Sequence, residues 1–459
     1  METTTPIEDK KETFTKSFNI SLPNLSGIWA MLSKLGSKID IWHIFFVNLA
    51  MRLFLVSTPN DGGMVFDEIH YIKATRAILE GIAANAEHPP LVKLMVGLFI
   101  KIFGDYWFSW RMPIILFSMF IPIILYRIVM DLTSDKKKAL FVAAFSCFDI
   151  ILFIHGNIYM LEMPSLVLAL VAAMYMIEKK YGKSALAMGF ACLCNEKAVF
   201  ALLGMAIYQF WMLPRTMSGK ETGKKVLTYL TICAIIGFGG LWISDTIWKP
   251  SKTSSSNVVT NVIVYTDAEG NPVNTVTTTV TNVDNVYITD PLDHLLFMFG
   301  YYTGLSNNIP QIPETWRPAW SWIGPWGPNW DHGPAYLSTS VSYGDKHYMT
   351  INYIGQTPFF IWWMFLPVLV LGLFVVKTTE TKFITAWMIG NYLPWLLWDG
   401  IRQNIPFNHY FMFTSIGCCM GIPFFWGKVL PKYQYQATTI HLIATIIFFF
   451  MYFPLGIFR

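Results

Sequence analysis

Two adjacent carboxylates, Asp67 and Glu68, stand near the start of the stretch Phe66–Lys93, shortly after an apolar segment. A carboxylate at a membrane surface can act as the base that takes a proton from an acceptor hydroxyl. Repulsion between neighbouring carboxylates raises the pKa of one of them, which suits a base working near neutral pH. The alternative is that both are solvated loop acids without a chemical role.

The same stretch ends in a rigid corner, His88-Pro89-Pro90, which is followed by Lys93. Two prolines fix the backbone and exclude His88 from a regular helix. The corner can aim His88 or Lys93 into a site, or it can simply start a helix that has proline in its first turn.

Two arginines, Arg111 and Arg402, fall at the expected outer ends of apolar segments. Arginine holds phosphate in a bidentate manner, so both are candidates, with Lys93, for binding the phosphate of a lipid-linked donor. A lone arginine at such a place more commonly snorkels to the interface. Arg402 stands out because further polar side chains surround it in sequence: Asp399, Gln403, Asn404, Asn408 and His409. Polar clusters at a membrane edge are usually functional.

Three more side chains are candidates for the same site, namely Glu162, His409 and Tyr410. The neighbouring pair Glu196-Lys197 at a predicted hairpin tip is either a local ion pair or a part of the site. No metal or other cofactor is expected. Two carboxylates can hold Mg²⁺ or Mn²⁺, but the loop offers no third ligand.

Composition indicates a protein that crosses a membrane several times. The chain is 54% hydrophobic and 14% charged, whereas soluble domains are about 25% charged. The net charge of +4 is dispersed over loops, which argues against nucleic acid as a partner. Phosphate-binding and dinucleotide-binding glycine motifs are absent from the sequence, so ATP- or NAD-driven chemistry is not supported.

The apolar segments predict an all-α polytopic membrane protein with about eleven spans. Lysine-rich loops place the N-terminus in the cytoplasm and the C-terminus outside. This assignment works when residues 67–80 and 91–103 are surface helices rather than spans. The expected spans are 41–57, 111–131, 138–154, 161–178, 184–196, 198–213, 226–247, 358–377, 383–398, 409–426 and 437–456.

The predicted topology divides the chain into four parts. They are a cytoplasmic tail (1–40), an N-terminal transmembrane module (41–247) with a catalytic loop (58–110), an extracytoplasmic loop (248–357) and a C-terminal four-span module (358–459). Within the long loop, alternating Val and Thr around a turn predict a β-hairpin over 257–288. The polar candidates all fall on the extracytoplasmic side.

The candidate residues also carry a family resemblance. The first loop, Phe66-Asp67-Glu68-Ile69-His70-Tyr71 with His88-Pro89-Pro90-Leu91-Val92-Lys93, resembles that of the dolichyl-phosphate-mannose protein mannosyltransferases. Further stretches are similar to that family in the same order: Trp110-Arg111-Met112-Pro113, Tyr159-Met160-Leu161-Glu162, Asn195-Glu196-Lys197, Ile354-Gly355-Gln356-Thr357-Pro358, Tyr392-Leu393-Pro394-Trp395, Arg402 and Phe407-Asn408-His409-Tyr410.

The resemblance implies a GT-C fold with two juxtamembrane helices in the first extracytoplasmic loop. It also implies inverting transfer of a hexose, with mannose expected, from a polyprenyl or dolichyl phosphate to Ser or Thr of a protein. Asp67 would be the base and Glu68 its assistant, with Arg111 and Arg402 at the lipid phosphate. The chain lacks the inserted β-trefoil domain of the family, as prokaryotic members do, which implies the cell membrane of a prokaryote.

Two other hypotheses remain open. A transferase of the same fold can act on a lipid or glycan acceptor instead of a protein. A transporter is the alternative from a different class, and it predicts acidic residues at mid-membrane. The clustering of the acids at one face argues against a transporter.

Overall fold

The computed structural model divides into two units, Met1–Ile39 and Asp40–Arg459, and all elements below belong to the second. The described residues are 27, 30, 31, 34, 36–56, 64, 67–82, 84–212, 219–250, 264–266, 272–275, 287–288, 290–308, 319–324, 342–343, 346–347, 358–402 and 408–452.

Helices dominate the described residues, which confirms the predicted all-α architecture. The first part of the chain forms α2 (Ile41–Leu55), α3 (Glu68–Leu79), α4 (Leu91–Phe103), α5 (Trp107–Ser118), α6 (Ile121–Thr133), α7 (Lys136–Cys147), α8 (Ile150–His155), α9 (Glu162–Ile177), α10 (Tyr181–Cys194), α11 (Ala198–Met212) and α12 (Gly219–Trp248). The second part forms α13 (Pro291–Asn308), α14 (Phe359–Trp362), α15 (Phe365–Val370), α16 (Thr379–Arg402), α17 (Met412–Val429) and α18 (Gln434–Tyr452), with the short turns η2 (Ala319–Ile323), η4 (Leu371–Val375), η5 (Asn408–Phe411) and η6 (Pro431–Tyr433).

Four short strands occur in the segment between α12 and α14. Strand β1 (Val264–Thr266) pairs antiparallel with β2 (Pro272–Thr275), and β3 (Ser342–Tyr343) pairs antiparallel with β4 (Lys346–His347). The rest of the predicted hairpin at 257–288 lies largely outside the described residues.

Helices α3 and α4 coincide with the two predicted surface helices. Each buries one face: α3 buries Tyr71 and Ile78, and α4 buries Val92 and Val96. This spacing is that of an amphipathic helix. Pro90 directly precedes α4, where its missing N–H leaves no helical hydrogen bond unmade.

Helix α9 is largely enclosed by the other described helices. It packs against α10, α6, α5 and α11, and most of its side chains are buried. Its first residue, Glu162, is 2% exposed. A carboxylate at the N-terminus of a buried helix therefore starts the central element of the fold.

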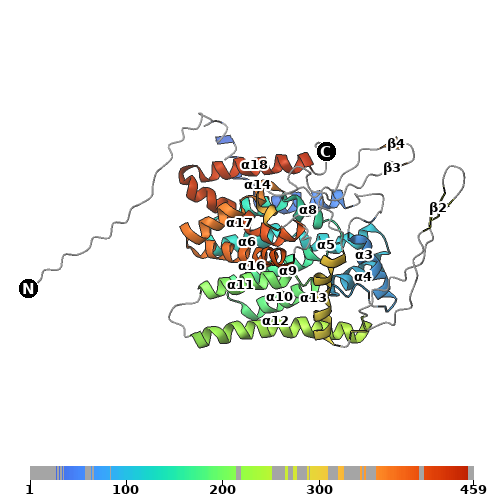
Figure 1. Ribbon diagram of the computed structural model, residues 1–459. Helices are drawn as coiled ribbons and strands as arrows, with labels where there is room; N and C mark the ends of the chain where they lie inside the picture. The colour runs from blue at the N-terminus through green and yellow to red at the C-terminus, as the bar shows by residue number, and fades with distance from the viewer. Residues whose placement is uncertain are drawn as a thin grey trace, which may run out of the picture. The chain divides into compact units, whose positions relative to one another are not determined.

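Helices α3 and α4 lie at one end of α10 and α12 (Figure 1). Helix α4 contacts α10, and the indole Nε1 of Trp248, the last residue of α12, donates to the Ile78 carbonyl at 3.3 Å. Helix α13 packs against α12 near the same end. The loop between α3 and α4 is thus held against the ends of long apolar helices.

Four described stretches are long and apolar enough to cross a membrane, namely Trp107–Thr133, Gly219–Trp248, His409–Val429 and Pro431–Met451. Shorter apolar helices cover Ile41–Leu55, Glu162–Ile177, Ala198–Met212 and Phe359–Val375. Large apolar side chains are exposed on these helices, and contact with lipid explains such exposure. The total of eleven spans stays a prediction.

Candidate active site

The two adjacent carboxylates have different surroundings. Glu68 has no exposed side-chain surface and forms a bidentate ion pair with Arg111, in which Nε donates to Oε1 at 2.9 Å and Nη2 to Oε2 at 2.7 Å. Glu68 Oε1 also accepts the Tyr159 backbone N–H at 2.8 Å, and Arg111 Nη1 donates to the Val56 carbonyl at 3.1 Å. A buried pair of this kind needs such extra hydrogen bonds to offset its desolvation.

Asp67 directly precedes α3 and is half-buried. Its carboxylate makes no capping hydrogen bond to the first turn of the helix. Burial raises the pKa of Asp67, and the nearby charge of Glu162 raises it further, whereas His88 and Lys197 lower it to a smaller extent. A carboxyl with a raised pKa has the property that the sequence predicts for a base.

Glu162 forms the second buried ion pair. Lys197, in the turn between α10 and α11, donates from Nζ to Glu162 Oε1 at 2.7 Å, and both side chains are at most 6% exposed. Among the described residues, Glu162 Oε2 is buried and makes no hydrogen bond. Burial lowers the pKa of Lys197, but Glu162, Tyr410 and Glu196 together raise it by more, so the pKa lies above its ordinary value and the amine stays protonated.

The turn that contains Lys197 reaches the His-Pro-Pro corner. Lys197 Nζ is 3.9 Å from Glu196 Oε1, and Glu196 Oε2 is 3.3 Å from Nδ1 of His88. The ion pair of Lys197 with Glu196 is therefore longer than its ion pair with Glu162. His88, Glu196, Lys197 and Glu162 form one chain of charged and titratable groups, which we call the polar chain.

Aromatic rings enclose the polar chain. The Lys197 ammonium lies 4.2 Å from the ring centre of Tyr410, a cation–π contact. Tyr410 stacks on Trp395, and Tyr71 packs edge-on against His88. Tyr410, in the turn η5 between α16 and α17, thus lies close to residues at the starts of α3, α9 and α11.

His409 is buried and lies face to face with His155, with ring centroids 4.8 Å apart. His155 ends α8, and His409 is the second residue of the turn η5. The structure therefore brings together the regions of Asp67, His88, Glu162, His409 and Tyr410, all five predicted from sequence.

Lys93 is 1% exposed and binds the loop that precedes it. Its Nζ donates to the Asn85 carbonyl at 2.6 Å, to Asn85 Oδ1 at 3.3 Å and to the His88 carbonyl at 2.9 Å. Burial lowers its pKa to about 7. The predicted partner of Lys93 was the phosphate of the donor, but its ammonium instead binds carbonyl groups of the loop. A lysine with these partners, only partly charged at neutral pH, is a weak phosphate ligand.

A second set of hydrogen bonds, from His294, holds the loop that Lys93 binds. His294 of α13 has Nδ1 at 2.8 Å from Asp245 Oδ1, and its Nε2 donates to the Ala86 carbonyl at 2.9 Å. Both side chains are buried. Sequence reasoning missed this pair because 49 residues separate its members. The one available signal was an acid in the last turn of a long apolar helix.

The structure describes the side chain of only one of the other two predicted phosphate ligands, Arg111 and Arg402. The guanidinium of Arg111 is engaged by Glu68 and Val56, as described above. The side chain of Arg402 lies outside the described residues, so its role stays a prediction. Lys197 is the buried cation of the polar chain, and the sequence had left it between a local ion pair and a site residue. No cluster suited to a metal occurs among the described residues.

Residues 87–242 match the profile of the family described as dolichyl-phosphate-mannose-protein mannosyltransferase. This match covers 156 of the 459 residues, over which the chain is similar to that family. None of the curated proteins matches the chain.

The GT-C glycosyltransferase fold extends over nearly the whole chain. The solved S. cerevisiae protein O-mannosyltransferase Pmt1-Pmt2 complex bound to the sugar donor is similar over 90% of this chain and 89% of that chain, with a TM-score of 0.65 and 11% identity. ArnT from Cupriavidus metallidurans in the apo state covers 89% of this chain and 62% of that chain at a TM-score of 0.48 and 12% identity, too low to carry an argument. With the long apolar helices described above, this likeness indicates an integral membrane protein.

The buried pair of Glu68 and Arg111 gives a stability prediction. Glu68→Ala leaves the Arg111 charge buried without its partner, so it should lower the free energy of unfolding by about 3–5 kcal/mol. The double variant Glu68→Leu with Arg111→Met should recover most of that loss. Unfolding of the purified protein in detergent measures both effects.

The exposed pair Arg76–Asp105, at 2.7 Å, is the matched control. Arg76→Ala should cost about 0–1 kcal/mol, because water replaces an exposed partner. Equal losses for Glu68→Ala and Arg76→Ala would show that the Glu68–Arg111 pair does not hold the fold.

Proposed function

We propose that this protein transfers mannose from a polyprenyl- or dolichyl-phosphate donor to Ser or Thr hydroxyls of proteins, with inversion at the sugar. The observation that carries the proposal is the half-buried Asp67, with its raised pKa, beside the polar chain. The structurally similar yeast complex is bound to the sugar donor, which supports a donor of this class.

The reaction assigns one task to each charged group. Asp67 accepts the proton of the acceptor hydroxyl while the oxygen of that hydroxyl attacks the anomeric carbon of the sugar. The bond from that carbon to the phosphate oxygen breaks on the opposite face, so the configuration inverts. The lipid phosphate leaves with the electron pair, and cations stabilise its charge. Lys197 is our candidate for this role, with Arg402 as the second.

Glu162 is assigned a positioning role in this scheme. It holds the ammonium of Lys197 through Oε1, and its charge contributes to the raised pKa of Asp67. Its second oxygen, Oε2, is buried and suited to accept a hydrogen bond from a sugar hydroxyl. No metal ion has a part in the proposed reaction.

The proposal includes the predicted membrane arrangement. Asp67, the polar chain and the 248–357 loop lie on the extracytoplasmic side, and the tail 1–40 lies in the cytoplasm. The modules 41–247 and 358–459 form the membrane-embedded scaffold with about eleven spans. The positive-inside distribution of lysines supports this arrangement.

Transfer assays with labelled polyprenyl-phosphate hexoses test the function. Membranes that contain the full chain should transfer mannose to Ser/Thr peptides, and the product should have the anomeric configuration opposite to that of the donor. Peptides with Ser and Thr replaced by Ala are the acceptor control. A chelator should leave the rate unchanged.

Each other outcome of these assays overturns part of the proposal. Label found only in a lipid or glycan fraction would replace the protein acceptor. Label found only with another hexose would replace mannose. Absence of transfer to every acceptor would overturn the function.

The pH dependence of turnover tests the role of Asp67. The base works only when it is deprotonated, and its pKa is raised above the ordinary 3.8. Turnover should therefore fall on acidification with a midpoint above 3.8. The variant Glu162→Gln removes a negative charge that raises the pKa of Asp67. It also leaves the positive charge of Lys197, which lowers that pKa, without its neutralising partner. The midpoint should therefore move to lower pH.

Glu80→Gln is the control for this experiment, because Glu80 is exposed and caps the far end of α3. It should leave the midpoint in place. A midpoint that stays in place or rises in Glu162→Gln would contradict the electrostatic coupling of Glu162 to Asp67.

A further inference from the structure

A groove opens at the end of the bundle opposite the candidate active site. Helix α9 begins at Glu162 in the site and ends beside the groove at Ile177, which lines it. Helix α11 likewise begins next to Lys197 and ends at Met212, which also lines the groove. At 1.5 Å per residue, the length of α9 separates groove and site by about 24 Å.

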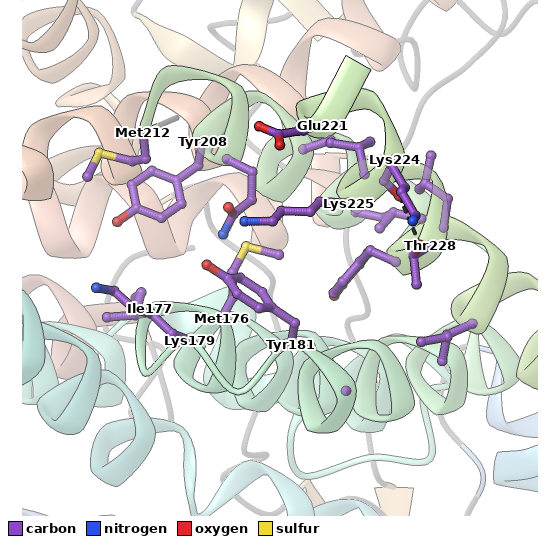
Figure 2. Close-up of a pocket in the computed structure, with 18 residues that line it drawn as sticks. Met176, Ile177, Lys179, Tyr181, Tyr208, Met212, Glu221, Lys224, Lys225 and Thr228 are labelled. Carbon is purple, nitrogen blue, oxygen red and sulfur yellow. Dashed lines mark hydrogen bonds between the residues drawn. The ribbon is translucent and has the colours of Figure 1, made fainter. Parts of the chain in front are cut away.

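The groove exists because α11 and α12 follow each other in sequence but pack on different neighbours. Helix α11 packs mainly against α16, and α12 packs mainly against α10. The gap between them has a volume of about 960 Å³ (Figure 2). This is near the upper end of the range of about 300–1,000 Å³ that is usual for ligand sites.

The walls of the groove are mainly apolar and aromatic. They include Met176, Leu202, Tyr208, Met212, Tyr229 and Ile232. The outer faces of the flanking helices are also apolar, since Phe210 of α11 is 71% exposed and Leu227 of α12 is 65% exposed. Exposed apolar side chains of this size on an integral membrane protein face lipid tails. The groove therefore opens next to the acyl region.

Three lysines surround one side of the groove. Lys179 follows α9, whereas Lys224 and Lys225 belong to the first turns of α12, and all three are exposed. Figure 2 shows the end of Lys225 directed to the space between Tyr181 and Tyr208, whereas the end of Lys179 lies to the left of that space. Glu221 is the one acid among the lining residues, so the rim has an excess of positive charge.

We propose that this groove binds a phosphate-headed lipid. The head contacts the lysines at the rim, and an acyl chain lies between α11 and α12. Apolar walls beside a basic rim match the two parts of such a lipid, and a soluble anion would have no use for the walls. The predicted topology puts these lysines at the cytoplasmic surface, where anionic lipids are enriched. Binding at this site does not depend on the transfer reaction.

Lipid titration of the purified full chain tests this site. Native mass spectrometry with dioctanoyl phosphatidylglycerol, with phosphatidylcholine of the same chain length as comparison, gives both dissociation constants. Phosphatidylglycerol should bind more tightly, and inorganic phosphate should not displace it. Equal affinity for the two lipids, or displacement by inorganic phosphate, would overturn the proposal.

Variants locate the binding. Lys179→Gln combined with Lys224→Gln should weaken phosphatidylglycerol binding about tenfold or more, because each lysine loses its attraction for an anionic lipid. Ala206→Trp, which fills the groove from α11, should weaken binding of both lipids. Lys428→Gln removes an exposed lysine at the end of α17 and should change nothing.

Thermal unfolding of each variant without lipid checks that it is folded. The two groove variants act on different parts of the site, so the test does not depend on one of them. Folded variants at both positions that bind phosphatidylglycerol as the wild type does would overturn the assignment.

Discussion

The buried ion pair between Glu68 and Arg111 is the constraint on which the candidate site depends. It ties α3 to α5, and its extra hydrogen bonds reach the end of α2 and the segment before α9. Because Glu68 is fully committed to this pair, it fixes the start of α3 and with it the position of Asp67. Two neighbouring acids thus separate into one that holds the fold and one that is left for proton transfer in the proposed reaction.

In the rest of the site, too, buried charged groups lie next to groups of opposite charge. Lys197 lies between Glu162 and Glu196, and Glu196 continues to His88. The loop that carries His88 is in turn fixed by Lys93 on one side and by the pair of His294 and Asp245 on the other. A site built from five distant segments therefore needs few exposed loops to keep its geometry, which favours a preorganised reaction centre.

Local sequence patterns predicted the helices well, but they predicted the partners in buried ion pairs poorly. The helical spacing of residues 67–80 predicted α3, and the lysine distribution over the loops identified 91–103, now α4, as a surface helix rather than a span. Arg111 was expected at a phosphate, since its acidic partner stands 43 residues earlier in the chain. The Glu162 partner of Lys197 is 35 residues away, so the adjacent Glu196 was the visible candidate. Long-range pairing of charges is set by packing, which single-sequence patterns do not encode.

Chemical rescue tests the central claim, that Asp67 acts as the base, most directly. The measurement is the turnover of Asp67→Ala, in protein that unfolds like the wild type, with and without added formate. The account predicts turnover near background without formate and a partial return that grows with formate concentration, since a small carboxylate replaces the missing base. Turnover close to that of the wild type without formate would contradict it.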